Sequence, residues 1–197
     1  SERLHKHGHF RRGIGCPRGL MAIILGVDPG LTRCGYAVFD SAKNQAIAFG
    51  MFQSQPTSEP RDRVGAIAQE LRNLVNQHQP EMVALERVFA QANLRSVMGV
   101  AQVSGALMSI AFDAGIPLQF FTPSEVKAAV TGNGRATKDQ VGMMVTRILK
   151  LDEVPKPADV ADALAVAICA SKRGVNVGTS AQQQWVAAAK KASRRLG

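Results

Sequence analysis

Four acidic side chains interrupt or border apolar stretches of this 197-residue chain. Asp28 and Glu86 each end a short apolar run, whereas Asp159 and Asp162 lie three residues apart in an alanine-rich segment. A helix over that segment would put both aspartates on one face. Carboxylate oxygens without histidine or cysteine are the ligands of Mg²⁺ or Mn²⁺. Two such ions about 4 Å apart can activate water and stabilise the leaving oxygen of a phosphodiester. The pattern therefore predicts a metal-dependent phosphodiesterase site.

Each acid also has a simpler interpretation when it is taken alone. The sequence Asp28-Pro29-Gly30 is typical of a tight turn, and Glu86 can accept a hydrogen bond from an amide at a strand end. Asp159 falls in a first helical turn, where an acid favours the helix dipole. Asp162 fits less well, because the next turn should be apolar. A carboxylate beside a core strand needs a positive partner, and no lysine or arginine occupies a matching core position. We therefore expect the partner to be a metal ion.

Hydrophobic periodicity and turn residues predict the elements that would carry these acids. Alternation indicates strands, and recurrence at three and four residues indicates helices. Capping boxes from Thr122 and Thr137 begin two of the helices. The expected strands are 23–27, 34–39, 46–52, 82–85 and 117–121, and the expected helices are 61–78, 92–114, 123–131, 138–151 and 158–171. This order predicts an α/β fold with a mixed five-stranded sheet flanked by helices, and a right-handed crossover between parallel strands.

The net charge of +9 lies at the two ends of the chain, because residues 1–20 carry +4, residues 171–197 carry +6 and the middle carries −1. Basic ends suit a polyanionic partner, although solvated, disordered tails are an equal alternative. We expect a flexible basic extension at 1–20, with Met21 as a candidate natural start, a nuclease domain at 21–171 and a basic tail at 172–197. Three cysteines without metal-type spacing favour a reducing compartment. No apolar run is long enough for a membrane span, so we expect a cytoplasmic protein.

Several of these runs together resemble one known family. They are GVDPGLTRCGYAV at 26–38, ALERVF at 84–89, TPSEVKAAVTGNG at 122–134, ATKDQV at 136–141 and ADVADALAVAI at 158–168. They closely resemble the bacterial RuvC Holliday-junction resolvases, and the resemblance covers about 21–170. It implies an RNase H-like fold and a homodimer that nicks a four-way DNA junction symmetrically in recombination and repair. It also implies Mg²⁺ as cofactor, two per subunit with Mn²⁺ able to substitute, and RuvA and RuvB as branch-migration partners.

Carried over residue by residue, the resemblance assigns catalytic and metal-binding roles to the four acids, Asp28, Glu86, Asp159 and Asp162. It also implies that Phe89 lies near the junction centre and that Lys127 and Lys138 contact DNA. Arg135, in the glycine loop at 132–134, clusters with these lysines and suits phosphate contacts. Read from the residues alone, Phe89 is also compatible with a core anchor, and both lysines with plain surface positions. The small residues of 92–114 suit either a dimer contact or tight packing within the chain.

Three other functions remain open on the sequence. An actin-like or sugar-kinase-like ATPase also begins with a strand, an aspartate-containing turn and a hairpin, but it needs a second lobe for which 197 residues leave no room. A DNA-binding protein of the same fold would not need all four acids. A related nuclease acting on an RNA–DNA hybrid would need them, so substrate comparison is required to distinguish it.

Overall fold

The computed structural model describes residues 23–87 and 94–173. They form five strands and five helices in the order β1 (Ile23–Asp28), β2 (Arg33–Asp40), β3 (Gln45–Gln53), α1 (Pro60–His78), β4 (Met82–Glu86), α2 (Leu94–Asp113), β5 (Leu118–Phe121), α3 (Pro123–Thr131), α4 (Lys138–Leu149) and α5 (Ala158–Arg173). The predicted order of elements is confirmed. Helix α1 begins one residue earlier than expected, because Pro60 stands at its first position, where a missing N–H costs nothing.

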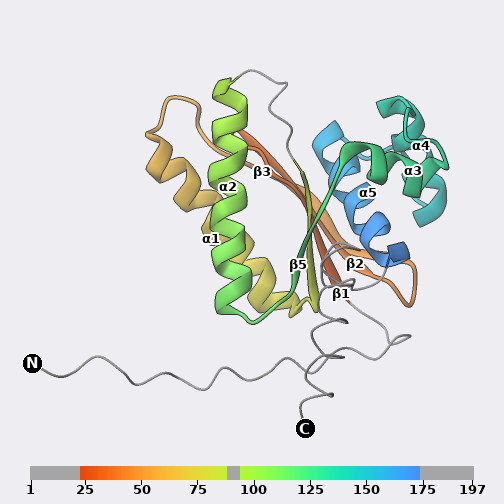
Figure 1. Ribbon diagram of the computed structural model, residues 1–197, viewed down its shortest axis with the longest axis horizontal. Coiled ribbons are helices and arrows are strands. Elements are labelled where there is room, and N and C mark those ends of the chain that lie inside the picture. The colour runs from red at the N-terminus through yellow and green to blue at the C-terminus, as the bar shows by residue number, and fades with distance from the viewer. Residues whose placement is uncertain (1–22, 88–93, 174–197) are drawn as a thin grey trace, which may run out of the picture.

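The five strands form one mixed sheet in the order β3-β2-β1-β4-β5 (Figure 1). The first three strands are an antiparallel meander, in which Asp28 at the end of β1 pairs with Gly35 of β2. The strands β1, β4 and β5 are parallel to one another. Parallel neighbours need crossover connections, and α1 and α2 supply them. The carboxyl ends of β1 and β4 therefore meet at one edge of the sheet.

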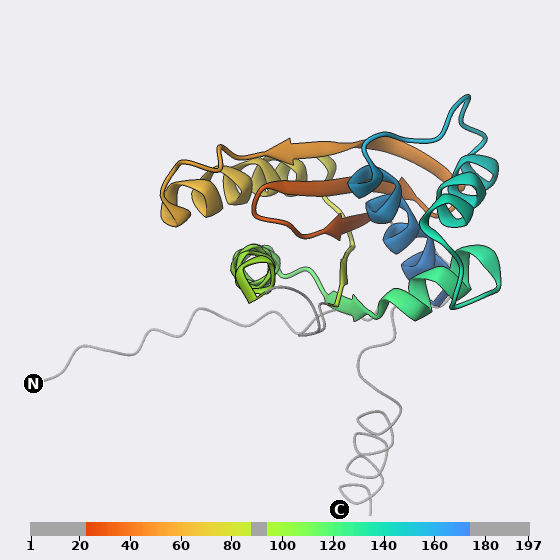
Figure 2. The same ribbon diagram turned by 90° about the horizontal axis from the view of Figure 1, so that it is seen from above.

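Helices cover the sheet in two layers. Figures 1 and 2 show α1 and α2 on one face and α3, α4 and α5 on the other. Because side chains alternate along a strand, each strand contributes to both cores. In β1, Leu25 and Val27 pack with the core of α1 and α2, whereas Ile24 packs with the core of α5. Asp28 has the same parity as Ile24, so it belongs to the face that α5 covers.

Two glycines allow α5 to lie directly against the middle of the sheet. A Cβ atom on Gly26 would come within 2.6 Å of the Ala163 carbonyl oxygen and 2.8 Å of the Ala167 Cβ. A Cβ atom on Gly35 would collide with the Asp159 carbonyl oxygen. Every α5 residue from Val160 to Ala170 except Asp162 is buried. This close approach fixes where the first turns of α5, and hence its two aspartates, stand above the strand ends.

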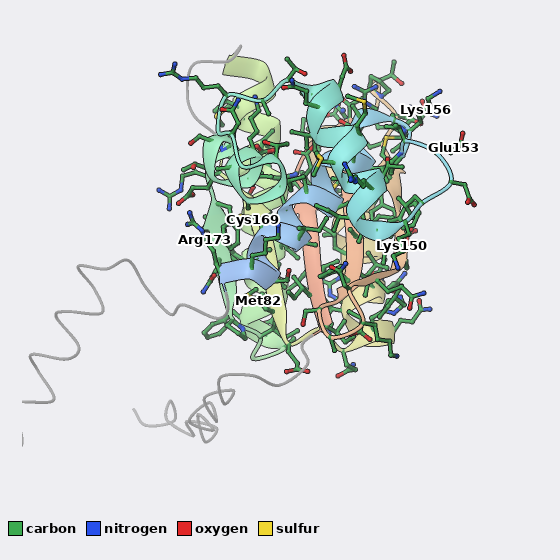
Figure 3. The ribbon with its side chains drawn as sticks, turned by 90° about the vertical axis from the view of Figure 1, so that its right-hand side faces the viewer. Met82, Lys150, Glu153, Lys156, Cys169 and Arg173 are labelled. Carbon is green, nitrogen blue, oxygen red and sulfur yellow. The ribbon has the colours of Figure 1, made fainter. Side chains whose placement is uncertain are left out.

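The helices α3 and α4 begin as the sequence predicts, at complete capping boxes from Thr122 and Thr137. They pack on α5 and hold its far end. Arg173 Nη1 lies 2.7 Å from Glu125 Oε1, and Lys172 Nζ donates to the Ala129 carbonyl oxygen at 2.7 Å. Figure 3 looks onto this layer, with Arg173 at the end of α5 remote from the α4–α5 connection. The C-terminal end of the helix that carries two of the acids is thus held by α3.

Three of the predictions lie outside the described residues: the extension at 1–20, the tail beyond 173 and the position of Phe89. The helix expected at 92–114 is described from Leu94 to Asp113, and the helix expected to reach 151 ends at Leu149. Within the described ranges, no helix is both long and apolar enough to cross a membrane.

Candidate active site

Strand register brings Asp28 and Glu86 together. Val27 of β1 pairs with Leu85 of β4, and each carboxylate follows one residue later on its strand. Both side chains point to the face covered by α5, because Glu86 has the same parity as Met82 and Ala84 of that core. The two acids therefore stand side by side where the central parallel strands end.

The first turns of α5 bring the other two acids to the same place. Asp159 lies above Gly35, the residue that pairs with Asp28, and Asp162 lies one turn further along. Their side chains are each 21% exposed. Two cations hold them: Arg33 Nε lies 3.3 Å from Asp159 Oδ2, and Lys138 Nζ lies 2.9 Å from Asp162 Oδ2.

The pKa of Asp28 reflects both its burial and its closeness to the other acids. The pKa of Asp28 is raised from 3.8 to about 7, chiefly by burial and then by the charges on Glu86, Asp162 and Asp159, in that order of importance. The charge on Lys138 opposes these effects. Burial disfavours the ionised form of this carboxyl group, and the three neighbouring acids add an excess of negative charge to that effect. A divalent cation at this position would relieve that excess.

Glu86 shares this environment. Burial and the charge on Asp162 raise the pKa of Glu86, whereas the charges on Lys138 and Lys127 lower it. The pKa of Lys138 is raised, chiefly by its hydrogen bond to Asp162 and also by the charges on Asp28 and Glu86. Both lysines to which the family resemblance assigns DNA contacts thus lie within electrostatic reach of the acids.

Two of the acids have basic partners, although no lysine or arginine occupies a matching core position. Arg33 and Lys138 occupy exposed positions at the starts of β2 and α4, so a search restricted to core positions does not find them. In residues 23–87 and 94–173, no three His, Cys, Asp or Glu side chains converge closely enough to hold an ion. The backbone gathers four carboxylates, but the side chains of Asp159 and Asp162 are turned towards their cations.

A cleft of about 320 Å³ opens beside Asp159, between the β1–β2 turn and the start of α2. Its walls are Gly30, Leu31, Thr32, Arg33, Arg63, Gly99, Val100 and Asp159. The sequence analysis did not single out Arg33 or Arg63, and no periodicity marks either of them.

The remaining predicted contacts are less closely tied to the acids. Arg135 is exposed in the α3–α4 loop, where its backbone N–H donates to Asn133 Oδ1 at 2.9 Å. Lys127 is partly buried on α3. Phe89 lies outside the described residues.

A meander of three antiparallel strands, two further parallel strands and acids from β1, β4 and the last helix together form the RNase H-like fold that the sequence predicts. The family model for the crossover junction endodeoxyribonuclease RuvC matches residues 24–170. A RuvC of Paenarthrobacter aurescens is 47% identical over 87% of this chain and 97% of its own length. A RuvC of Streptomyces griseus is 52% identical over 74% of this chain and 73% of its own. The chain therefore belongs to the RuvC family of crossover junction endodeoxyribonucleases.

Solved structures agree with this assignment. The RuvC of Thermus thermophilus in complex with a Holliday junction substrate is 32% identical, with a TM-score of 0.70 over 75% of this chain and 92% of that one. A second structure of the T. thermophilus RuvC gives 31% identity and a TM-score of 0.67 over the same shares. The yeast mitochondrial Holliday junction resolvase, at 14% identity and a TM-score of 0.57, shares the fold.

Proposed function

We propose that this protein is a Mg²⁺-dependent endonuclease that resolves four-way DNA junctions by paired symmetric nicks in recombination and repair. The observation that carries the proposal is the gathering of three further carboxylates around Asp28 in a chain of the RuvC family. The family resemblance further supports action as a homodimer with the RuvA and RuvB branch-migration proteins. Hydrolysis would leave 5′-phosphate and 3′-hydroxyl ends.

The donor set fits a hard divalent cation. Asp28, Glu86, Asp159 and Asp162 offer carboxylate oxygens only, as Mg²⁺ prefers. They would hold two Mg²⁺ ions once Asp159 and Asp162 exchange their cations for metal, and Mn²⁺ would serve in their place. When bound, Mg²⁺ supplies a lowered pKa for water and charge stabilisation at the leaving oxygen. The raised pKa of Asp28 supports this assignment, because the site favours added positive charge.

The two lysines would act on the DNA. Lys138 lies 2.9 Å from Asp162 and also feels the charges of Asp28 and Glu86. Released from Asp162, its ammonium group is positioned to contact a phosphate at the acids. Lys127 offsets the charge of Glu86 from α3. We infer that both lysines neutralise the scissile phosphate, that Arg135 contacts the backbone nearby, and that Phe89 stacks on a base near the junction centre.

Cleavage of defined substrates tests the proposal. Wild-type protein is incubated with a synthetic four-way junction, a linear duplex of the same sequence and an RNA–DNA hybrid, each with Mg²⁺ and with EDTA. We expect paired nicks of like polarity in the junction, only with Mg²⁺, and little cutting of the other two. Preferred cleavage of the hybrid would indicate the related nuclease function, and binding without nicks would indicate a DNA-binding protein.

An exposed apolar stripe on α2 supports the homodimer. Met98, Met108 and Phe112 are 59%, 48% and 77% exposed, and the small residues Ala101 and Gly105 lie between them on the same side of the helix. A contiguous apolar patch of this kind is typical of an interaction surface. Small residues would let a second copy of the helix approach closely.

We expect Phe112→Glu to convert the dimer to a monomer, because an isologous interface would bury two added carboxylates. Analytical ultracentrifugation at micromolar protein measures the mass. The matched control is Met143→Glu, which changes a residue 58% exposed on α4, on the opposite face of the sheet. A dimer that survives in the Phe112 variant, with both variants folded, would move the interface elsewhere.

A further inference from the structure

The cleft beside Asp159 has the chemistry of an anion site. Arg33 and Arg63 both line it, from the start of β2 and from α1. Guanidinium groups present planar pairs of N–H donors that match phosphate oxygens. Asp159 also lines the cleft, so it opens directly from the candidate active site.

Arg63 is fixed in place by its neighbours. Its Nε donates to Ser54 Oγ at 2.9 Å, and its Nη2 donates to Thr32 Oγ1 at 2.8 Å. Ser54 also donates its hydroxyl to the Leu31 carbonyl oxygen, and its N–H bonds the Thr32 carbonyl oxygen at 3.1 Å. Of the five N–H groups of this guanidinium, these bonds among the described residues use two. The others remain for a ligand in a preformed position.

Arg33 is held more weakly. Its side chain is 55% exposed, and its ion pair with Asp159 spans 3.3 Å. Ion pairs this exposed contribute little to stability. Metal binding by Asp159, as the proposed function requires, would therefore release Arg33 at small cost. Its guanidinium is then next to the cleft that Arg63 already faces.

The walls of the cleft favour a sugar–phosphate backbone over a base. Its lining among the described residues is two arginines, one aspartate, a threonine and small or aliphatic residues, with no aromatic ring on which a base would stack. The wall is also closely packed, because a Cβ atom on Gly99 of α2 would come within 2.8 Å of Leu31 Cβ. A closely packed cleft suits a ligand group of constant shape, and the phosphate group is the same in every nucleotide.

We propose that this cleft binds a phosphate of the cleaved strand adjacent to the scissile phosphate, with Arg63 as its fixed contact and Arg33 as a second contact that leaves Asp159. This inference rests on the proposed function. Asp159 is one of the four acids and also lines the cleft. A strand with its scissile phosphate at the acids therefore passes this cleft with a neighbouring phosphate.

A double-mutant cycle between protein and DNA tests this. Junctions are made with a single neutral methylphosphonate at each phosphate flanking the nick, one per substrate. Single-turnover cleavage with Mg²⁺ at subsaturating protein is measured for wild type, Arg33→Gln and Arg63→Lys. The control is Arg61→Gln, since Arg61 is an exposed arginine of α1 that pairs with Asp62 and does not line the cleft.

We expect one flanking methylphosphonate and the Arg33→Gln change each to slow cleavage about tenfold, and their combination to slow it no further. Arg63→Lys should show the same coupling at that position, and Arg61→Gln none. Additive effects at every position would overturn the proposal and leave Arg33 acting only through Asp159. Unchanged cleavage by Arg33→Gln would overturn it as well. Failure of the wild type to cut any junction would instead refute the proposed function.

Discussion

Junction cleavage is expected to fall by at least about 10³-fold when Asp28 is replaced by asparagine, while the metal-free protein becomes more stable. Loss of a carboxylate ligand removes several kcal/mol of charge stabilisation in the transition state, and each 1.4 kcal/mol is about tenfold in rate. Binding of the four-way junction should persist, because the change removes negative charge near the DNA. Single-turnover cleavage with Mg²⁺ and anisotropy binding in EDTA measure the two effects.

The stability gain has a defined pH window. The folded-state pKa of Asp28, about 7, is above its ordinary value of 3.8 because of burial and three neighbouring acids. The folded state therefore retains the proton that the unfolded chain releases, so wild-type stability falls as pH rises from about 4 to about 7. Asp28→Asn should escape this loss and be more stable by about 2–4 kcal/mol above pH 7. Thermal unfolding in EDTA at a series of pH values measures the difference.

The control is Asp152→Asn, at an exposed acid in the α4–α5 connection. It should leave both cleavage and the pH profile unchanged. Retained cleavage by Asp28→Asn would refute the metal-ligand role. A profile parallel to that of the wild type would show that Asp28 ionises normally.

We expect Gly35→Ala to disrupt the candidate active site, although it changes none of the four acids. The added methyl group would collide with the Asp159 carbonyl oxygen, so the start of α5 must move away from the sheet. Overpacking of this kind costs about 1–3 kcal/mol, and a shift of about 1 Å in catalytic groups can cost 10²-fold in rate. Denaturant unfolding and single-turnover cleavage report the two effects.

Gly65→Ala is the matched control, because nothing lies within 4 Å of a Cβ atom at that position in the middle of α1. It should stabilise the protein by up to about 1 kcal/mol, as alanine favours helix over glycine, and leave cleavage unchanged. If the Gly35→Ala variant cleaved junctions as fast as the wild type, close packing of α5 on β2 would not be required for cleavage. The placement of Asp159 would then need another explanation.

The fold was predictable because its signals are local. Alternation marked β2, the period of 3.6 marked α1, and capping boxes at Thr122 and Thr137 fixed two helix starts. The meeting of Asp28 and Glu86 also follows from the sequence, because both end strands of one parallel pair. The close packing of α5 on the sheet was harder to predict, because the role of Gly26 and Gly35 is evident only once the position of the helix above them is known.

The partners of the acids were the part that sequence reasoning missed. Arg33 and Lys138 are long side chains on exposed positions, and they reach the site from a hairpin and a helix start. Hydrophobic patterns describe what faces the core and do not indicate where a flexible cation points. Arg63 was missed for the same reason, because its hydrogen bonds to Ser54 and Thr32 join segments that are distant in sequence.

The seating of α5 on the sheet also has a consequence for synthesis of the protein. Asp28 and Glu86 lie in the first half of the described chain, but Asp159 and Asp162 arrive only with its last helix. A nascent chain that still lacks α5 holds two of the four acids and an uncovered sheet face. Completion of the proposed metal site therefore coincides with completion of the core, because both need α5 on the sheet.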